Sequence, residues 1–299
     1  MRAVVYTQYG EPEVLGVGEL EVPHAGPGEV RIAVRGASVN PLDWKQVGGL
    51  MARGDAPPRP AVPGYDAAGV VDEVGEGVTG VRAGDAVFGL GTSTAAEHAV
   101  LRAWAPKPEG LSFEVAAGLG VAGETAVRVL DLLGLPEGGT VVVDGASGGV
   151  GMATVQVAVS RGLRVVGTSS PANADLVRSL GAVPTTYGEG LADRVRELAP
   201  GGVDGAVDTA GKGSVPDLVA LTGDPARVVT IADFGAGALG VQVTTSNDGG
   251  APRLAEVAGL AAQGRLELPV QEVYPFERAA DALRVSREGH VRGKLVLVP

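Results

Sequence analysis

The feature that most restricts how this chain can fold is a cluster of small residues between an apolar run and helix-forming sequence. Residues 140–143 read TVVV, which is typical of a buried strand, and residues 145–151 read GASGGVG. Helix-compatible sequence follows from about residue 149. Glycine lets the backbone turn tightly and lets another group come close to it. The chain must therefore contain a strand, a bare turn and a helix in direct succession.

The turn fits the pattern A-x-G-x-x-G, which uses Ala146, Gly148 and Gly151. Between a strand and a helix this pattern is a dinucleotide fingerprint, because unpaired N–H groups at a helix N-terminus attract a pyrophosphate. A side chain on Gly148 would block the pyrophosphate, and one on Gly151 would push the helix off the strand. The pattern also fits an ordinary glycine-rich turn. We interpret it as a cofactor site with the candidate binding residues Ala146, Ser147, Gly148, Gly149 and Val150.

The end of the next strand indicates which dinucleotide binds. An NAD site normally places Asp or Glu there, to accept hydrogen bonds from the ribose 2′-hydroxyl. Residues 167–173 read GTSSPAN, and the first carboxylate is Asp175. Hydroxyl and amide groups can donate to a 2′-phosphate, so the sequence favours NADPH, although this loop has no Lys or Arg. The candidate donors, which could instead only cap the following helix, are Thr168, Ser169, Ser170 and Asn173, with Tyr187 from the next loop.

Two sequence patterns divide the chain into domains. Up to residue 112, short strand-like runs broken by Gly, Pro and Asp predict a small antiparallel barrel or sandwich. From residue 113, strand-like and helical segments alternate, which predicts a parallel sheet with helices on both faces. The last stretch holds two helices and a terminal strand, KLVLV. We expect an α/β protein with a first domain at 1–112, completed by 255–299, and a doubly wound Rossmann domain at 113–254.

Single elements follow from the same patterns. The first domain is expected to hold a short helix at NPLDWKQ, where Asn40 can cap, Pro41 suits the first helical position and Asp43 lies in the first turn. Ser112 can cap the first helix of the second domain. The expected strands are 3–6, 29–34, 67–74, 95–101, 140–143, 163–167, 205–208 and 226–232, and the expected helices of the second domain are 113–120, 123–133, 149–160, 172–180, 190–198 and 214–221.

The charge and hydropathy of the chain exclude several classes of partner. The 299 residues carry a net charge of −11 with no dense Lys/Arg run, which argues against nucleic acid and anionic membrane partners. No run approaches the roughly 18 apolar residues of a membrane span, and the first residues lack a signal-peptide pattern. We expect a cytoplasmic protein.

The content of metal-binding residues is low. The chain has no cysteine, which removes disulfides, thiol nucleophiles and thiolate metal sites. Its three histidines, His24, His98 and His290, are far apart in sequence and belong to no ligand motif. We interpret them as surface or core residues and predict no metal site.

Several segments together resemble one known family, the zinc-independent medium-chain dehydrogenases/reductases of the quinone oxidoreductase (zeta-crystallin-like) branch. They span nearly the whole chain in the family's order. The matching segments are ASVNPLDWK (37–45), PGYDAAGVVDEVGEGVTGVRAGDAVFG (63–89), AEHAV (96–100), the VVVDGASGGVG loop, ETAVRVL (124–130), RSLGA (178–182) and GHVRGKLVL (289–297).

This resemblance implies a GroES-like β-barrel built from both chain ends, a central Rossmann domain and an active site in the cleft between them. It implies that Asn40 and Thr125 lie near the nicotinamide and its ribose, and that the pyrophosphate lies over the glycine turn. Ile231 and Ala232 would border the nicotinamide. Arg292 and Lys294 would reach the cofactor from the terminal segment, unless that segment is only a solvated turn.

The resemblance also implies a reaction. Zinc-dependent relatives use Cys and a Gly-His-Glu segment as ligands, whereas this chain reads Gly64-Tyr65-Asp66 there. Without a Lewis acid, the expected chemistry is hydride transfer from NADPH to a quinone or an α,β-unsaturated carbonyl compound. The negative charge on the carbonyl oxygen then needs a donor. Lys45 is the first candidate and Tyr65 the second; solvent is the alternative source of the proton.

Two residues depart from the family pattern. Glu124 stands where an apolar residue is usual, and we expect it to face solvent, the alternative being an added acid in the cleft. Asp144, ahead of the glycine turn, would need hydrogen-bond partners if buried.

Two other functions stay open: a dedicated enoyl or enone reductase of a secondary pathway, and a non-catalytic NADPH-binding structural or regulatory protein. By analogy we expect a homodimer joined through the edges of the Rossmann sheets.

Overall fold

The computed structural model describes residues 1–52, 54–57, 60–244, 250–289 and 291–299, which form two compact units. The first, named the barrel unit, comprises Met1–Val121, Gly249–Ala262 and Leu268–Pro299. The second, named the Rossmann unit, comprises Ala122–Asp248 and Gln263–Glu267. His290 lies outside the described residues. The domain division expected from the sequence stays a prediction.

The barrel unit is built on a six-stranded sheet in the order β13-β14-β3-β4-β5-β6, and an additional pairing of β3 with β6 closes four of its strands into a ring. The ring forms because β3 is long enough to pair with β4, β6 and β14 along its length. A separate hairpin joins β1 and β2. The strands are β1 (Arg2–Val5), β2 (Gly16–Glu19), β3 (Val30–Val39), β4 (Asp66–Val74), β5 (Ala86–Thr92), β6 (His98–Pro106), β13 (Val270–Pro275) and β14 (Lys294–Val298).

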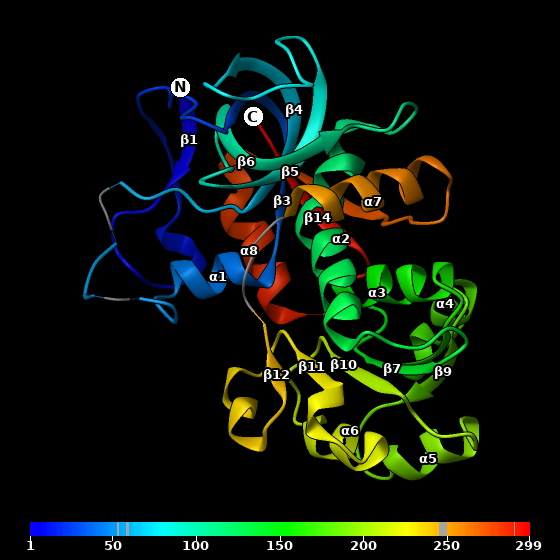
Figure 1. Cartoon of the computed structure of the whole chain (residues 1–299). Coiled ribbons are helices and arrows are strands. Elements are labelled where there is room, and N and C mark those ends of the chain that lie inside the picture. The colour runs from blue at the N-terminus through cyan, green and yellow to red at the C-terminus, as the bar shows by residue number, and fades with distance from the viewer. Residues whose placement is uncertain (53, 58–59, 245–249, 290) are drawn as a thin grey trace. The chain divides into compact units, whose positions relative to one another are not determined.

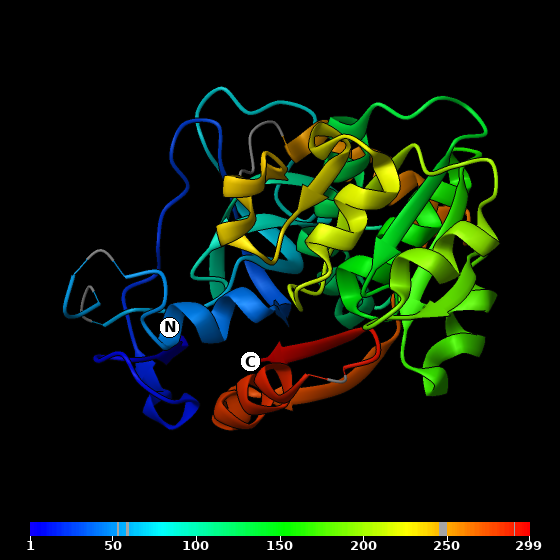
Figure 2. The ribbon, with the colours of Figure 1, turned by 90° about the horizontal axis from the view of Figure 1, so that it is seen from below.

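Apolar side chains fill this barrel. Alternate residues of the strands, among them Val30, Ile32 and Leu101, are fully buried, as expected for a sheet with one face inward. The C-terminal strand β14 pairs antiparallel with β3, and α8 lies beside β13 and β14 (Figure 2). The helices of the unit are α1 (Pro41–Val47), α7 (Gly250–Ala262) and α8 (Ala279–Glu288), with 3-10 turns η1 (Pro12–Val14) and η5 (Phe276–Arg278).

The Rossmann unit contains a six-stranded, all-parallel sheet in the order β12-β11-β10-β7-β8-β9. This order reverses direction at β7, so the sheet is doubly wound with a topological switch point between β7 and β10. The strands are β7 (Thr140–Asp144), β8 (Arg164–Ser169), β9 (Val183–Thr186), β10 (Gly205–Asp208), β11 (Val228–Thr230) and β12 (Gln242–Val243).

Helices cover both faces of this sheet (Figure 1): α3 and α4 lie on one side, and α5 and α6 on the other. The strands are short and apolar, and Val141, Val142 and Val143 of β7 are completely buried, as a sheet covered twice requires. The helices are α3 (Gly149–Ser160), α4 (Ala174–Ser179), α5 (Leu191–Leu198) and α6 (Val215–Thr222), with 3-10 turns η2 (Pro171–Asn173), η3 (Pro225–Arg227) and η4 (Phe234–Leu239).

The α/β class, the Rossmann sheet and most elements agree with the sequence-based expectations, and one element does not. Residues 113–120 and 123–133 form a single helix, α2 (Phe113–Leu133), rather than two. Gly118 and Gly120 weaken helix propensity, but burial of the apolar side chains of α2 outweighs it. Ser112 caps this helix as expected, because its Oγ accepts a hydrogen bond from Val115 N at 3.3 Å.

Candidate cofactor and active site

The glycine turn between β7 and α3 is as tight as the sequence suggests. Gly145 has a φ of +82°, a region that favours glycine, and Gly148 N donates to Gly145 O at 3.0 Å. A Cβ on Gly151 would lie 2.0 Å from Gly145 O, which is an impossible contact. The expectation that Gly151 lets α3 pack against the strand is therefore confirmed.

Gly148 is different, because the protein itself does not require glycine there. Its φ of −84° suits any residue, and a Cβ would meet only Gly145 O, at an ordinary 3.5 Å. The N–H groups of Gly149, Val150 and Gly151 have no acceptor in the part of the chain that the structure describes. The turn thus offers free donors at a helix N-terminus, with an open approach over Gly148.

Asp144, at the end of β7, organises the base of this turn. Its side chain is 2% exposed and accepts hydrogen bonds from Thr168 Oγ1 and, at 2.5 Å, from Ser214 Oγ. Burial raises the pKa of Asp144, although both hydroxyls oppose the shift. Thr168 Oγ1 also accepts from Gly145 N at 3.0 Å. The Thr168 hydroxyl proton is therefore engaged inside the protein, and this residue supports the turn.

The remaining candidates around the adenosine phosphate lie near one another. Asn173 Nδ2 donates to Ser147 Oγ at 3.2 Å, while Asn173 Oδ1 is buried and has no partner among the described residues. Since a serine hydroxyl can donate as well as accept, the amide can be turned so that Nδ2 is available to a ligand. Ser169 Oγ donates to Ser170 O at 3.1 Å, and Tyr187 is an exposed residue directly after β9, the strand that pairs with β8.

Thr125 lies in α2 next to a buried ion pair. Arg128 Nε is 3.2 Å from each carboxylate oxygen of Glu124, and Glu124 is only 1% exposed. The expectation that Glu124 faces solvent is therefore wrong; a buried arginine one turn along the helix neutralises it. Arg128 Nη2 also donates to Thr125 Oγ1 at 3.2 Å, and Arg128 Nη1 donates to Thr244 Oγ1.

In the barrel unit, a buried polar cluster surrounds Asn40. Lys294 Nζ donates to Asn40 Oδ1 at 2.7 Å, and Asn40 Nδ2 donates to Asp66 Oδ1 at 2.7 Å. Asp66 Oδ2 accepts from Val121 N, also at 2.7 Å. Both ends of the Asn40 amide are thus fixed, and Lys294 acts on that amide rather than projecting outward.

Asp43 completes this cluster at the start of α1. Its carboxylate accepts from Asn40 N at 2.7 Å and from Gly64 N at 3.0 Å, so the cap of α1 is made by Asp43 and not by the Asn40 side chain. Burial raises the pKa of Asp43 to about 7, and the neighbouring Asp66 adds to the shift. Burial also raises the pKa of Asp66 and lowers that of Lys294, while the opposite charges of these two residues counteract both shifts.

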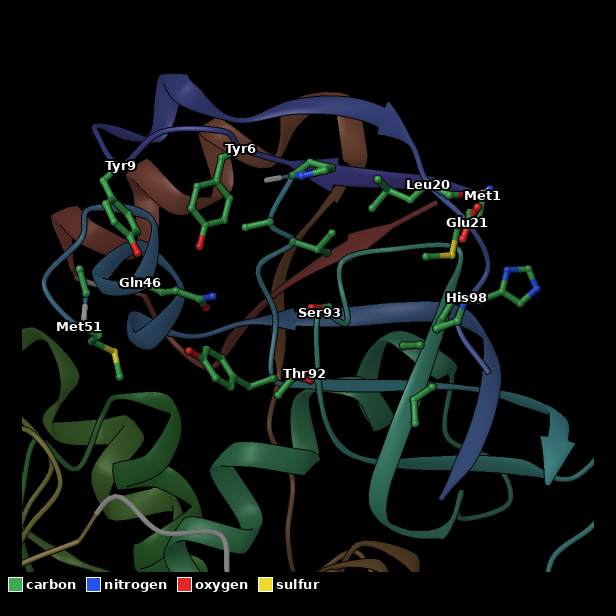
Figure 3. Close-up of a pocket in the computed structure, with 18 residues that line it drawn as sticks. Met1, Tyr6, Tyr9, Leu20, Glu21, Gln46, Met51, Thr92, Ser93 and His98 are labelled. Atoms are coloured by element: carbon green, nitrogen blue, oxygen red, sulfur yellow. Dashed lines mark hydrogen bonds between the residues drawn. The ribbon is translucent and has the colours of Figure 1, made fainter. Parts of the chain in front are cut away.

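A cavity of about 630 Å³ lies within the barrel unit, and Tyr65 and Gln46 line it. Figure 3 shows Tyr6, Tyr9, Gln46 and Met51 at one end and Met1, Leu20, Glu21 and His98 at the other. Burial raises the pKa of Tyr65 to about 12, so its hydroxyl stays protonated at neutral pH. Lys45 precedes Gln46 on α1 and lies with its Nζ 5.6 Å from the Trp44 ring.

The other expected contacts lie at ends of strands. Ile231 and Ala232 follow β11, and the Asp208 side chain joins this end to β10 by accepting from Thr230 Oγ1 at 2.7 Å. Arg292 is exposed, and its backbone N donates to Gln271 Oε1 at 2.8 Å. Of the candidate residues, Asn40, Lys45, Tyr65, Arg292 and Lys294 belong to the barrel unit; all others belong to the Rossmann unit.

Sequence reasoning missed three buried charged residues of these sites. Asp66 is the partner of Asn40, Asp43 is the centre of the cluster, and Arg128 is the partner of Glu124. Asp43 and Asp66 stand in the segments NPLDWK and GYDAAG, and the i, i+4 spacing of Glu124 and Arg128 is an ion-pair signal.

No three His, Asp or Glu side chains gather as a group that could hold a metal ion in the described ranges. Two histidines pair with carboxylates instead: His24 lies 3.2 Å from Glu73, and His98 lies 3.3 Å from Asp72. In the same ranges, no helix is both long enough and apolar enough to cross a membrane.

A closed barrel and a doubly wound sheet in one chain are the two parts of a medium-chain dehydrogenase/reductase. Family models match both: "Alcohol dehydrogenase GroES-like domain" over residues 26–130 and "Zinc-binding dehydrogenase" over residues 180–297. The chain is 34% identical to the chloroplastic NADPH-dependent alkenal/one oxidoreductase of Arabidopsis thaliana, over 100% of this chain and 80% of that protein.

Solved structures agree with this assignment. The structure of a mycobacterial protein complexed with NADPH superimposes with a TM-score of 0.86 and 28% identity over all of both chains. The quinone oxidoreductase of Coxiella burnetii gives a TM-score of 0.82 and 26% identity, over 100% of this chain and 99% of that one. The chain therefore belongs to the quinone oxidoreductase-like family of medium-chain dehydrogenases/reductases.

Proposed function

We propose that this protein is an NADPH-dependent reductase that acts on a quinone or an α,β-unsaturated carbonyl compound without zinc. The observation that carries the proposal is the open turn at Gly148, where neither backbone conformation nor packing calls for glycine. A ligand that must come close to the backbone does call for it. The free N–H groups of α3 make that ligand an anion, as a pyrophosphate is.

The residues present fit NADPH. Gly148, Gly149 and Val150 would hold the pyrophosphate, with Ala146 and Ser147 shaping the turn. The 2′-phosphate would be surrounded by Ser169, Ser170, Asn173 and Tyr187. Thr168 would support the turn from below, because its Oγ1 accepts a hydrogen bond from Gly145 N. Of the carboxylates near this end of β8, Asp144 is buried beneath the turn and bonded to Thr168 and Ser214, and Asp175 is almost wholly exposed on α4 and pairs with Arg178. A 2′-phosphate would therefore meet hydroxyl and amide groups that can donate to it.

Thr125, Ile231 and Ala232 would face the nicotinamide half from the Rossmann unit. From the barrel unit, Asn40 would contribute its amide, which Lys294 and Asp66 hold in one orientation. Arg292 is the exposed cation of the same terminal segment and would contact the cofactor.

The cavity at Tyr65 would take the substrate. Bound NADPH supplies the hydride in this class of reaction. The protonated Tyr65 hydroxyl would donate to the carbonyl oxygen as charge develops there, with Lys45 as the second candidate. Among the described residues, the cavity lining holds no Lys or Arg and one carboxylate, Glu21, which disfavours an anionic substrate.

A zinc-free site is part of this proposal. Asp66, at the position of the family's ligand segment, already accepts from Asn40 and Val121, and Tyr65 replaces the neighbouring ligand. The chemistry of this donor set suits hydrogen bonding better than metal binding.

The test is NADPH oxidation by the purified full chain with 1,4-naphthoquinone and with a simple alkenone, before and after EDTA treatment. We expect turnover with at least one substrate, unchanged by chelation. Loss of activity that zinc restores would contradict the zinc-free mechanism, and lack of affinity for either nicotinamide coenzyme would contradict the cofactor site.

The same assay separates the two other functions. Tight NADPH binding with no turnover over a broad panel of quinones and enones would favour a structural or regulatory protein. Activity restricted to one elaborate enone would favour a dedicated reductase of a secondary pathway.

We also propose a cytoplasmic homodimer that binds neither nucleic acid nor membrane. The acidic charge supports the lack of such partners. The outer strand β12 of the Rossmann sheet has one neighbour, β11, and offers an edge for pairing with a second copy. Light scattering coupled to size exclusion would test the dimer; a monomer at micromolar concentration would contradict it.

A further inference from the structure

The proposed function gives no role to the buried ion pair of Glu124 and Arg128 in α2. Glu124 and Arg128 are 1% and 7% exposed, so their charges are held away from water at a considerable desolvation cost. Well-packed apolar residues would serve stability equally well at such a place. Arg128 also gives one hydrogen bond to Thr125 and another to Thr244.

The bond to Thr125 fixes what the hydroxyl can do. Arg128 Nη2 lies 3.2 Å from Thr125 Oγ1, so the oxygen is the acceptor and its own proton is left for another group. Within the described ranges that proton has no acceptor. Thr125 is 6% exposed, so the residue is nearly but not completely buried.

A second threonine of the same unit, Thr154, uses its hydroxyl proton differently. Thr154, in α3, donates its hydroxyl proton to Val150 O, four residues earlier, at 2.8 Å. That is the usual behaviour of a threonine inside a helix. No such bond joins Thr125 to the carbonyl of Val121 in the described structure. The difference between the two threonines is the arginine beside Thr125.

We propose that Arg128, with its charge balanced by Glu124, is a positioning residue that holds the Thr125 hydroxyl as a hydrogen-bond donor to an oxygen of the nicotinamide-ribose half of the cofactor. This rests on the proposed function. The bond from Arg128 to Thr244 ties the same guanidinium to the segment that follows β12, on the half of the sheet that also carries Ile231 and Ala232.

A double-mutant cycle on NADPH affinity tests the proposal. Thr125→Val is combined with the neutral pair Glu124→Gln/Arg128→Gln, which avoids an unpaired buried charge. Each change alone should weaken NADPH binding, followed by fluorescence titration, about fivefold, as expected for loss of one ordinary hydrogen bond. In a chain that already carries Thr125→Val, the neutral pair should weaken binding no further.

Thr244→Val is the matched control, because it removes another hydrogen bond of Arg128 and leaves the one to Thr125. It should lower thermal stability without changing NADPH affinity. If the neutral pair does not fold, Arg128→Lys replaces it, since lysine keeps the charge opposite Glu124 but lacks the guanidinium fork; the same non-additive loss is expected.

Additive losses in the cycle would overturn the proposal, because Arg128 would then act on the fold and not through Thr125. Failure of the parent chain to bind NADPH would overturn the proposed function together with this inference. Parent binding with an additive cycle would overturn only the inference.

Discussion

At the scale of single residues, Gly148 and Gly151 of the turn are glycine for different physical reasons. Gly151 is needed by the protein, since an added Cβ would lie 2.0 Å from a backbone oxygen. Gly148 has room for a side chain and an ordinary φ. A glycine that the fold does not need is best explained by a ligand, and this contrast can be measured on one matched pair of variants.

Gly151→Ala should destabilise the chain by about 3 kcal/mol, the cost of overpacking that forces the backbone to move. Gly148→Ala should cost less than about 1 kcal/mol, because alanine is only a poorer N-cap than glycine. It should nevertheless weaken NADPH binding at least tenfold. Urea unfolding and cofactor titration of both variants check this. Equal affinity of Gly148→Ala and the parent would remove the argument for the pyrophosphate site.

The proton donor is a second question at this scale. Tyr65→Phe should lower kcat about 100-fold, a typical loss when a donor to a developing oxyanion is removed. Lys45→Met should change kcat by no more than about twofold if Lys45 only covers apolar surface with its stem. Steady-state kinetics with 1,4-naphthoquinone decide between them. A large effect of Lys45→Met with none of Tyr65→Phe would reverse the assignment, and no effect of either would leave solvent as the donor.

At the scale of elements, the junction of α1 with β4 depends on buried carboxylates. Asp43 caps the start of α1 and also accepts a hydrogen bond from the backbone of Gly64, two residues before β4. Its pKa rises from 3.8 to about 7 because burial disfavours the charged form. The folded chain therefore holds a proton on this group at pH values where the unfolded chain has lost it.

The sign of the pH dependence follows from that difference. Stability contributed by Asp43 is greatest below about pH 4 and declines as the pH rises to about 7, above which it is constant. The free energy of unfolding should fall between pH 5 and pH 8, as measured in urea. Asp43→Asn should be less stable, because it loses one backbone hydrogen bond, but should show a smaller fall over that interval. An identical fall in both proteins would contradict the shift.

Sequence patterns were sufficient for elements whose apolar residues alternate or recur in local order. Four of the six Rossmann strands, β7, β8, β10 and β11, and the turn at 145–151 could be predicted because their signals are contiguous; the short edge strands β9 and β12 were missed. The closure of the barrel by β3 and β6 could not, since pairing between distant strands leaves no local signal. The same reason hid the contact of Lys294 with Asn40. Glu124 was misjudged because a charged residue is normally exposed, and only its arginine partner makes burial tolerable.

At the scale of the whole molecule, cofactor binding should raise the stability of the chain. A ligand that binds only the folded state at 100 times its Kd adds about 2.7 kcal/mol. NADPH should therefore raise the melting temperature, and NADH, matched in concentration, should raise it less. Gly148→Ala should lose most of the NADPH shift. Equal shifts with both coenzymes would contradict the preference for the phosphorylated form.

The position of β14 has a consequence for synthesis. This strand leaves the ribosome after the whole Rossmann unit, yet it pairs with β3, which is made before that unit. The nascent chain thus holds an incomplete barrel unit while the sheet of the Rossmann unit is already fully translated. Lys294 arrives with β14, so the buried carboxylates of Asp43 and Asp66 have no cation beside them until this strand has been made. A nascent chain stalled before this strand would be a natural client for chaperones and an easy target for proteases.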